Sequence, residues 1–253
     1  MEQQRKTALD RAQAAGYLPH IHAIAQLATS AVWWSRASLP IGSAVLHNGT
    51  MCTIDTGEKT ISVTAGHVYS KYLAQKKQFR DLECQVGSVR VNLENYLIDY
   101  NADLDLATFE LSPILVAGSR SRPHGPPKWP PQEPLESEIV VLGGYPGLLR
   151  AEEQGRLATP FISFIDRVAQ TSPDHSAVQM NLEKAYWPDG SGGLVSSSDL
   201  GGMSGGPLFR YRTEPVEHFE IVGFIYEANT SYGLFFARHA SCISSSGHIA
   251  RGA

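Results

Sequence analysis

The chain has 253 residues, of which 42% are hydrophobic, so it can bury the core of one large all-β domain or of two small ones. Its formal net charge is −4 and it has no dense Lys/Arg cluster, which argues against a nucleic-acid partner. No apolar run approaches membrane-spanning length, so we expect no membrane partner either.

The first 40 residues are predicted to form a helical extension. Residues 2–15 are rich in Ala, Gln, Arg and Lys, and Gly16 and Pro19 interrupt this pattern. A second short helix is predicted by the spacing of Ile21, Ile24 and Leu27. We expect the extension either to brace the rest of the molecule or to contact a regulatory protein. His20 and His22 stand without a Cys, Asp or Glu cluster, so no metal site is predicted.

Residues 41–116 show the alternation and turns of a first antiparallel barrel. Strands are predicted at 43–46 and 51–54, with Asn48-Gly49 as a hairpin turn between them. After a turn at 55–59, further strands are predicted by the patterns at 60–64, 89–93 and 106–111.

Residues 117–136 contain six prolines and are predicted to cross the outside of the molecule as an extended connector. Proline has no backbone N–H, so it is excluded from central strands. A proline-rich recognition ligand is the alternative interpretation of the same composition. The prolines are Pro123, Pro126, Pro127, Pro130, Pro131 and Pro134.

Residues 137–253 are predicted to form a second barrel. Many short strands joined by Gly and Pro turns, without alternating helices, favour a barrel or a sandwich over an α/β fold. The predicted strands cover 138–142, 161–165, 178–182, 207–211, 219–226 and 234–237.

The stretch from Gly201 to Leu208 surrounds Ser204 with glycines on both sides. Glycine is used where the backbone turns tightly or approaches a ligand closely, so this turn presents the serine. A serine becomes nucleophilic when a base takes its proton and when N–H donors face the oxyanion that forms. The backbone N–H groups of Gly202 and Ser204 are the candidate donors.

Two upstream stretches complete a pattern. Thr64-Ala65-Gly66-His67 precedes Asp105-Leu106-Ala107, and the serine stretch follows both. These three stretches, by their residues and by their order along the chain, resemble the TAxH, D-L-A and GxSGGPL stretches of the chymotrypsin/trypsin-like serine proteases. The GxSxG pattern also fits the α/β-hydrolase elbow, but there the order is Ser, acid, His. The resemblance extends over roughly residues 41–245 and is specific at the three motifs.

This resemblance implies an all-β fold of two antiparallel six-stranded β-barrels, here with the N-terminal helical extension. It implies a serine endopeptidase, without cofactor or metal, that cuts a polypeptide substrate through an acyl-enzyme intermediate. Ser204 would be the nucleophile, His67 the general base and Asp105 the residue that orients His67. Asp103 remains an alternative candidate for the orienting acid, because residues two apart in a strand share a face. A protease-fold scaffold, catalytically silent or gated by a partner, is the alternative function.

One residue departs from the secreted members of that family. Relatives activated from a zymogen carry an aspartate just before the nucleophile, to pair with the freed N-terminal amine. This chain has Met203 there, and a thioether cannot form that ion pair. We therefore expect activity that needs no cleavage ahead of Ile41.

Substrate-binding positions follow from the same resemblance. Residues Tyr226, Glu227 and Ala228 are expected to pair with an extended peptide through their backbone. Gly233 would line the specificity pocket, with Ser198 or Asp199 near its floor. Asp199 would favour Lys or Arg before the cut, and Ser198 would favour small or apolar side chains. The charge of Glu227 favours basic or polar substrates.

The expected compartment is the cytoplasm. Cys52, Cys84 and Cys242 form an odd set, and none of them is adjacent to His67 or Ser204, which fits a reducing environment. The apolar core of a secretory signal is not seen after the N-terminus, because the best candidate is interrupted by His20, His22, Gln26 and Thr29.

Overall fold

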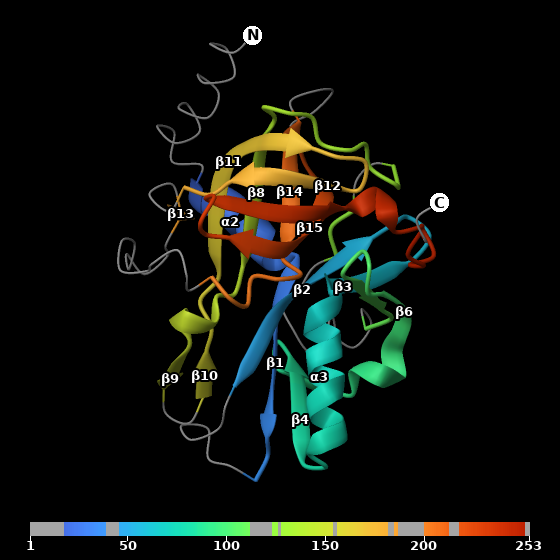
Figure 1. Ribbon diagram of the computed structural model, residues 1–253, viewed down its shortest axis with the longest axis vertical. Helices are drawn as coiled ribbons and strands as arrows, with labels where there is room; N and C mark the ends of the chain where they lie inside the picture. The colour runs from blue at the N-terminus through green and yellow to red at the C-terminus, as the bar shows by residue number, and fades with distance from the viewer. Residues whose placement is uncertain are drawn as a thin grey trace.

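The structure is a computed structural model that describes residues 18–38, 46–111, 123–125, 128–153, 156–181, 185–186, 200–212 and 218–250. Two seven-stranded antiparallel sheets dominate it, one from each half of the chain (Figure 1). The expected all-β class with few helices is confirmed. The predicted helix at 2–15 lies outside the described residues, as does most of the strand predicted at 43–46.

The first sheet has the strand order β5-β4-β1-β2-β3-β7-β6. Its edge strands β5 and β6 are not paired with each other, so this half is a half-barrel rather than the closed barrel that was expected. The strands are β1 (Thr29–Arg36), β2 (His47–Asp55), β3 (Thr60–Ala65), β4 (Leu82–Val86), β5 (Val89–Val91), β6 (Leu97–Asn101) and β7 (Leu106–Phe109).

The second sheet closes on itself. The order β12-β16-β15-β14-β8-β11 returns to β12 through the β12–β11 pairing, which makes a six-stranded antiparallel barrel with β13 attached to β11. A separate hairpin is formed by β9 (Ala151–Glu153) and β10 (Arg156–Ala158). The barrel strands are β8 (Ile139–Gly144), β11 (Ile162–Thr171), β12 (His175–Gln179), β13 (Ala185–Tyr186), β14 (Pro207–Arg212), β15 (His218–Asn229) and β16 (Leu234–His239).

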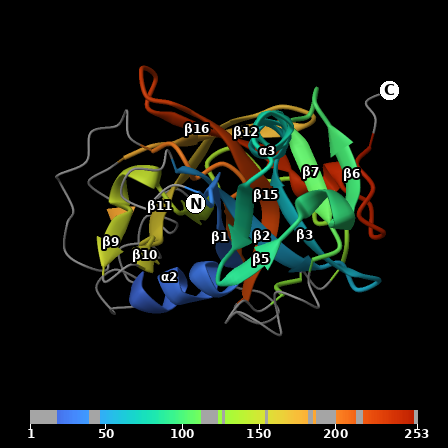
Figure 2. The same ribbon diagram turned by 90° about the horizontal axis from the view of Figure 1, so that it is seen from below.

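Helix α2 (Leu18–Leu27) packs against the second barrel, as a brace would. Its Ala25 is buried, and the Nδ1 atom of His22 lies 3.0 Å from the Ser163 hydroxyl of β11. His22 is therefore buried in this contact, and burial lowers its pKa. Figure 2 shows α2 and the second helix, α3 (Gly66–Gln78), on opposite sides of the molecule.

The boundary predicted at residue 40 does not separate the extension from the first sheet. Strand β1 pairs with both β2 and β4 in that sheet, although residues 29–36 were predicted as part of the helical extension. Its side chains are largely buried, with Val32 and Trp34 in the core, so burial in the sheet decides its conformation.

The hairpin predicted at Asn48-Gly49 is wrong. These residues lie inside the continuous strand β2 and pair with β1. Gly49 instead lets the backbone of β2 approach helix α3 closely, since a Cβ atom there would lie 2.7 Å from the Val68 side chain. The Asn48 side chain is also engaged, because its Nδ2 donates to the Tyr145 carbonyl at 2.8 Å. Both residues thus serve contacts distant in sequence rather than a turn.

Helix α3 was not predicted. It begins at Gly66, directly after β3, and buries Val68, Tyr69 and Tyr72 at helical spacing against the first sheet. Its last turn carries Lys76 and Lys77, whose positive charges interact favourably with the negative end of the helix dipole.

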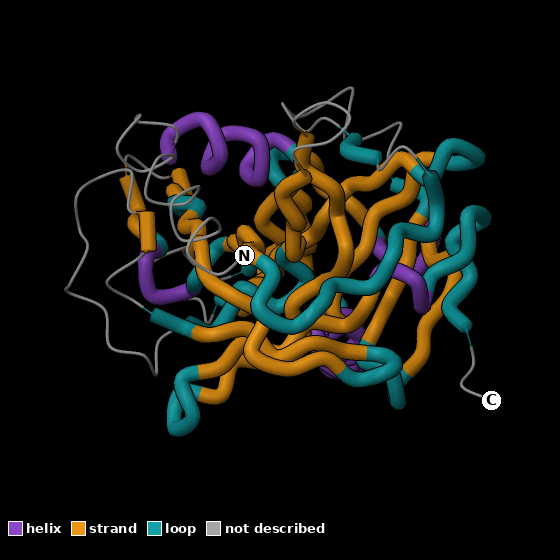
Figure 3. Tube along the Cα trace, turned by 90° about the horizontal axis from the view of Figure 1, so that it is seen from above, coloured by secondary structure: helices purple, strands orange, loops and turns teal. Residues whose placement is uncertain are grey.

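The two sheets share one hydrophobic cluster, and the trace seen from above in Figure 3 shows strands throughout the centre of the molecule. A second cluster lies within the first half and a third within the second barrel. The shared cluster holds the two halves together and includes Cys52, Ile54, Ile61, Val63 and Leu106 from the first sheet and Val141, Phe161, Phe209, Ile221 and Phe224 from the second barrel or next to it.

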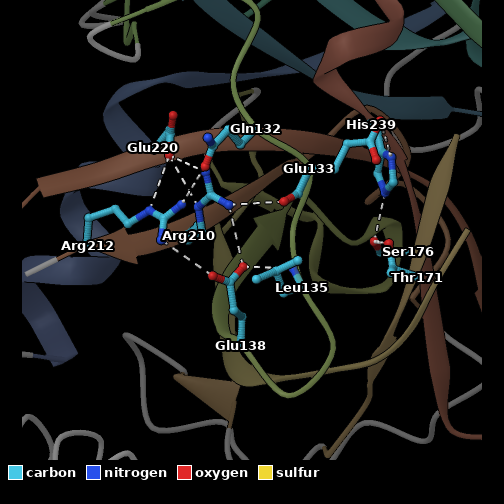
Figure 4. Close-up of polar contacts among 10 residues, drawn as sticks. All are labelled: Gln132, Glu133, Leu135, Glu138, Thr171, Ser176, Arg210, Arg212, Glu220 and His239. Carbon is cyan, nitrogen blue, oxygen red and sulfur yellow. Dashed lines mark hydrogen bonds and ion pairs between the residues drawn. The ribbon is translucent and has the colours of Figure 1, made fainter. Parts of the chain in front are cut away.

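A charged network attaches the described end of the connector to the second barrel (Figure 4). The buried Arg210 of β14 contacts Glu220 of β15 at 2.5 Å and Glu138 at 3.5 Å. Its Nη1 also donates to the Glu133 carbonyl at 3.1 Å, and the Leu135 N–H donates to Glu138 at 2.9 Å. Residues 128–135 thus follow the barrel without pairing as a strand, held by these polar groups and by Trp129, which packs against the shared core.

Candidate functional site

Ser204 lies in a turn that glycines make possible and that β2 holds in place. Gly202 and Gly205 have φ values of +107° and +91°, a region that side chains rarely adopt. A Cβ atom on Gly205 would also lie 2.0 Å from the Thr50 carbonyl oxygen. Thr50 binds the turn twice, since its N–H donates to the Ser204 carbonyl and its Oγ1 to the Gly202 carbonyl, both at 2.8 Å. The serine turn of the second half is therefore fixed to the first sheet.

His67 and Asp105 are in direct contact. His67 is in the first turn of α3, and its Nδ1 lies 2.8 Å from Oδ2 of Asp105. The other carboxylate oxygen accepts the His67 backbone N–H at 2.6 Å, and the Gly66 N–H donates to the Asp105 carbonyl at 2.8 Å. The start of the helix is thus attached to Asp105 at three points.

The structure distinguishes Asp105 from Asp103. Residues 102–105 form a turn rather than a strand, so the two side chains do not share a face. Asp103 is exposed, and its N–H donates to the Asn101 side chain at 2.9 Å. Asp105 adopts φ +51° and directs its carboxylate to His67. A left-handed aspartate is uncommon and is tolerated in turns of this kind.

This contact determines what the imidazole can do. An ionised carboxylate only accepts hydrogen bonds, so Nδ1 of His67 carries the proton that it donates to Asp105. A ring that donates from Nδ1 and carries no second proton has Nε2 as its acceptor. Such an imidazole can take a proton at Nε2, and the carboxylate stabilises the positive charge that results.

Ser204 and His67 line the same cavity, which has a volume of about 470 Å³. Gly202 lines it as well, and Trp34 and Asn48 contribute from the first sheet. Neither the Gly202 nor the Ser204 N–H donates a backbone hydrogen bond to another described residue. The cavity therefore combines a hydroxyl, an oriented imidazole and two candidate N–H donors.

The predicted substrate strand has a free edge within the part of the chain that the structure describes. β15 pairs with β14 up to Phe224, and beyond that point residues 227–229 pair only with β16. Glu227 is exposed, whereas Tyr226 and Ala228 are half-buried. Gly233 has φ +62° in the turn between β15 and β16, and its carbonyl accepts the Met180 N–H at 2.8 Å. Ser198 and Asp199 lie outside the described residues.

Met203 lies in the core of the second barrel and is 1% exposed. Its side chain packs among apolar neighbours and offers no charge to a terminal amine.

Sequence patterns did not reveal Arg238, which approaches this site from β16. Its Nε donates to the carbonyl of Leu104, the residue before Asp105, at 2.8 Å. The guanidinium also pairs with Asp174 and lies 4.7 Å above the Tyr226 ring. The second barrel thus supports the turn that carries Asp105. Lys71, Arg150 and Thr50 were missed as well, and only Lys71 had a local signal, four residues after His67 on the same helix.

Within the described ranges, no group of three or more potential ligands is arranged to hold a metal ion, and no helix combines the length and apolar character needed to cross a membrane. The three cysteines are free thiols. Burial raises the pKa of the Cys84 thiol to about 12, so this group is not a reactive thiolate at neutral pH.

No protein-family model matches this chain, and no curated protein matches it. Among solved structures, it is similar to one from a study of the coupled folding and binding of the intrinsically disordered Sesbania mosaic virus VPg protein. The two are 13% identical, the alignment covers 83% of this chain and 85% of that one, and the TM-score is 0.45.

Proposed function

We propose that this protein is a serine endopeptidase resembling the chymotrypsin/trypsin-like proteases. One observation carries the proposal: an imidazole whose Nδ1 lies 2.8 Å from a carboxylate lines the same cavity as a serine in a glycine-bounded turn. The fold alone does not require an Asp105-bound His67 and Ser204 to line one cavity, since each residue comes from a different segment. Acyl transfer needs these three groups to act together, and the shared cavity supports that role.

In this mechanism, Nε2 of His67 takes the proton of the Ser204 hydroxyl as its oxygen attacks the scissile carbonyl. The N–H groups of Gly202 and Ser204 stabilise the oxyanion, and Asp105 stabilises the imidazolium. His67 then gives the proton to the leaving amine, which leaves an acyl-enzyme. Water, activated by the same imidazole, hydrolyses the ester and frees the enzyme.

The free edge of β15 is the proposed binding strand for the residues before the cut. Backbone groups of 226–228 would pair with an extended peptide, which adds a strand to the sheet. The exposed Glu227 favours basic or polar substrate side chains along this edge. Gly233, with Ser198 or Asp199, remains the proposed pocket for the residue before the cut.

A fluorophosphonate probe tests the proposal, because it reacts with an activated serine without knowledge of the substrate. We expect the wild type to be labelled at Ser204, and Ser204→Ala to show no labelling under the same conditions. Ser196→Ala is the control, since this serine is in the same half of the chain but has no role in the proposed mechanism. Failure of the wild type to label would contradict the endopeptidase proposal and favour the alternative, a protease-fold scaffold or a form gated by a regulatory partner at the N-terminal extension.

A further inference from the structure

The cavity beside Ser204 carries an excess of positive charge. Lys71 and Arg150 both line it, together with His47, and no Asp or Glu is among the described residues of its lining. The two cations come from different halves of the molecule, since Lys71 is in α3 and Arg150 follows the second-half segment Gly147–Leu149. Two cations that line one cavity without a carboxylate produce a positive potential there, which favours an anion.

Arg150 is held in position by carbonyl groups. Its Nε donates to the Gly147 carbonyl at 2.8 Å and its Nη1 to the Leu46 carbonyl at 2.6 Å. Carbonyl oxygens fix the plane of the guanidinium and leave its charge in place. Among the described residues, no carboxylate forms an ion pair with Arg150. An anion in the cavity would therefore find a preorganised cationic partner.

Lys71 is on the same face of α3 as His67, one helical turn later. It is exposed and makes no ion pair with a described carboxylate. Both cations act on the His47 ring, because burial first, and then the charges of Arg150 and Lys71, lower its pKa. The neutral ring stacks on Trp34, with centroids 5.7 Å apart, and forms an uncharged wall.

The cavity lies on one side of the reacting groups. It contains His67, Gly202 and Ser204, whereas residues 226–228 of the β15 edge are not part of its lining. Under the proposed function, that edge binds the part of the substrate before the cut. The cavity then faces the residues after the cut, where His67 must deliver a proton to the leaving amine.

We propose that this cavity is a subsite for an acidic side chain, Glu or Asp, at the first or second residue after the cleaved bond. The inference rests on the proposed endopeptidase function and adds the residues that select the leaving side. Lys71 and Arg150 bind the carboxylate, and Leu148, which is 51% exposed at the rim, contacts the aliphatic part of the side chain. Selection by charge on this side is independent of the preference for the residue before the cut.

A peptide library tests the subsite. The wild type is incubated with a proteome-derived library, its cuts are identified by mass spectrometry, and the two best sequences are resynthesised with Glu, Gln or Lys at each of the two positions. All peptides are amidated at the C-terminus, so that a terminal carboxylate cannot bind in place of the side chain that is varied. We expect kcat/KM for Glu to exceed that for the isosteric Gln by about tenfold at one position, the size expected of a charge-assisted contact.

The Glu/Gln ratio is kcat/KM for the Glu peptide divided by kcat/KM for the Gln peptide. The variants Lys71→Glu and Arg150→Gln should reduce this ratio to near one, and Lys71→Glu should raise kcat/KM for the Lys peptide. Lys77→Glu is the matched control, since it makes the same charge change on an exposed residue of α3 outside the cavity lining and should keep the ratio. A ratio compares two substrates of one variant, so a general loss of activity cancels.

A Glu/Gln ratio near one in a wild type that the fluorophosphonate labels would overturn the subsite and leave the endopeptidase proposal intact. The subsite would also be overturned if Lys71→Glu and Arg150→Gln changed the ratio no more than Lys77→Glu. Absence of both labelling and cleavage would overturn the endopeptidase proposal, and the subsite with it.

Discussion

Asp105 shows how one residue is placed by several backbone contacts. Its φ of +51° is uncommon for a residue with a side chain, and such conformations persist where the surroundings fix them. Here the Asn101 side chain accepts the N–H groups of Asp103 and Leu104, at 2.9 and 3.0 Å, and the Gly66 N–H holds the Asp105 carbonyl. These contacts within the protein thus hold the carboxylate against His67.

At this scale we predict that Asp105→Asn slows fluorophosphonate labelling of Ser204 by about three to four powers of ten. The amide would favour the wrong tautomer of His67 and would not stabilise the imidazolium. Asp103→Asn is the matched control and should label within about twofold of the wild type, because Asp103 is exposed and does not contact His67. Equal decreases in labelling rate in the two variants would contradict the assignment of Asp105. Thermal unfolding of each variant would show whether its decrease comes from misfolding.

At the scale of elements, β14 connects the serine turn to the outside of the barrel. It follows the turn directly and carries Arg210, whose side chain is 2% exposed, toward Glu220 and Glu138, each 12% exposed. Arg212, two residues later, reaches Glu138 at 3.6 Å and Glu220 at 3.7 Å but is 35% exposed. The two arginines therefore provide a buried and a partly exposed version of the same contact.

We predict that Arg210→Met lowers the free energy of unfolding by about 3 kcal/mol, because two nearly buried carboxylates lose their main partner. Arg212→Met should cost less than about 1 kcal/mol, because its ion pairs are longer and their cation is partly exposed to solvent, which weakens such pairs. Urea denaturation of the two variants beside the wild type measures both values. Equal effects would mean that burial does not set the strength of this network.

At the scale of the whole molecule, buried or half-buried histidines lie at several of its internal contacts. His22 joins α2 to β11, and the Nε2 of His124 lies 2.5 Å from the Phe219 carbonyl, where the chain beyond the first sheet meets β15. His239 is completely buried in the second barrel, with Nε2 2.8 Å from the Ser176 hydroxyl (Figure 4). Burial is the main cause that lowers the pKa of all three below 6.5.

These lowered pKa values predict that the protein loses stability in mild acid. The unfolded histidines bind protons near pH 6.5, whereas the folded ones resist protonation until lower pH. Their contribution to stability is therefore complete above about pH 6.5 and is lost as the pH falls through the lowered folded values. Urea midpoints at pH 7.5, 6.5 and 5.5 should decrease in that order.

The variant His22→Gln should make this decrease shallower, since glutamine does not titrate. His20→Gln is the matched control, because it makes the same substitution at an exposed position of the same helix and removes no buried ring. A midpoint that is the same at pH 7.5 and 5.5 would contradict the role given to the buried histidines.

How much the sequence could predict depended on whether the signal was local. Alternation of apolar residues and the chemistry of Gly and Pro turns predicted the all-β class, the strand that leads to His67 and the turn at 55–59. The same signals failed at Asn48-Gly49, where the glycine makes room for Val68 of a helix instead of forming a turn. Local patterns could not distinguish these two uses of glycine.

The sequence by itself determined the residue types available for chemistry and their order, because a hydroxyl, an imidazole and a carboxylate are properties of single residues. The tertiary structure decided which of them meet: Asp105 rather than Asp103 contacts His67, and Ser204 lines the same cavity. It also brought Lys71 and Arg150, which are far apart in the sequence, into one cavity. Such contacts depend on how the two sheets pack across their shared core, and no local pattern encodes that packing.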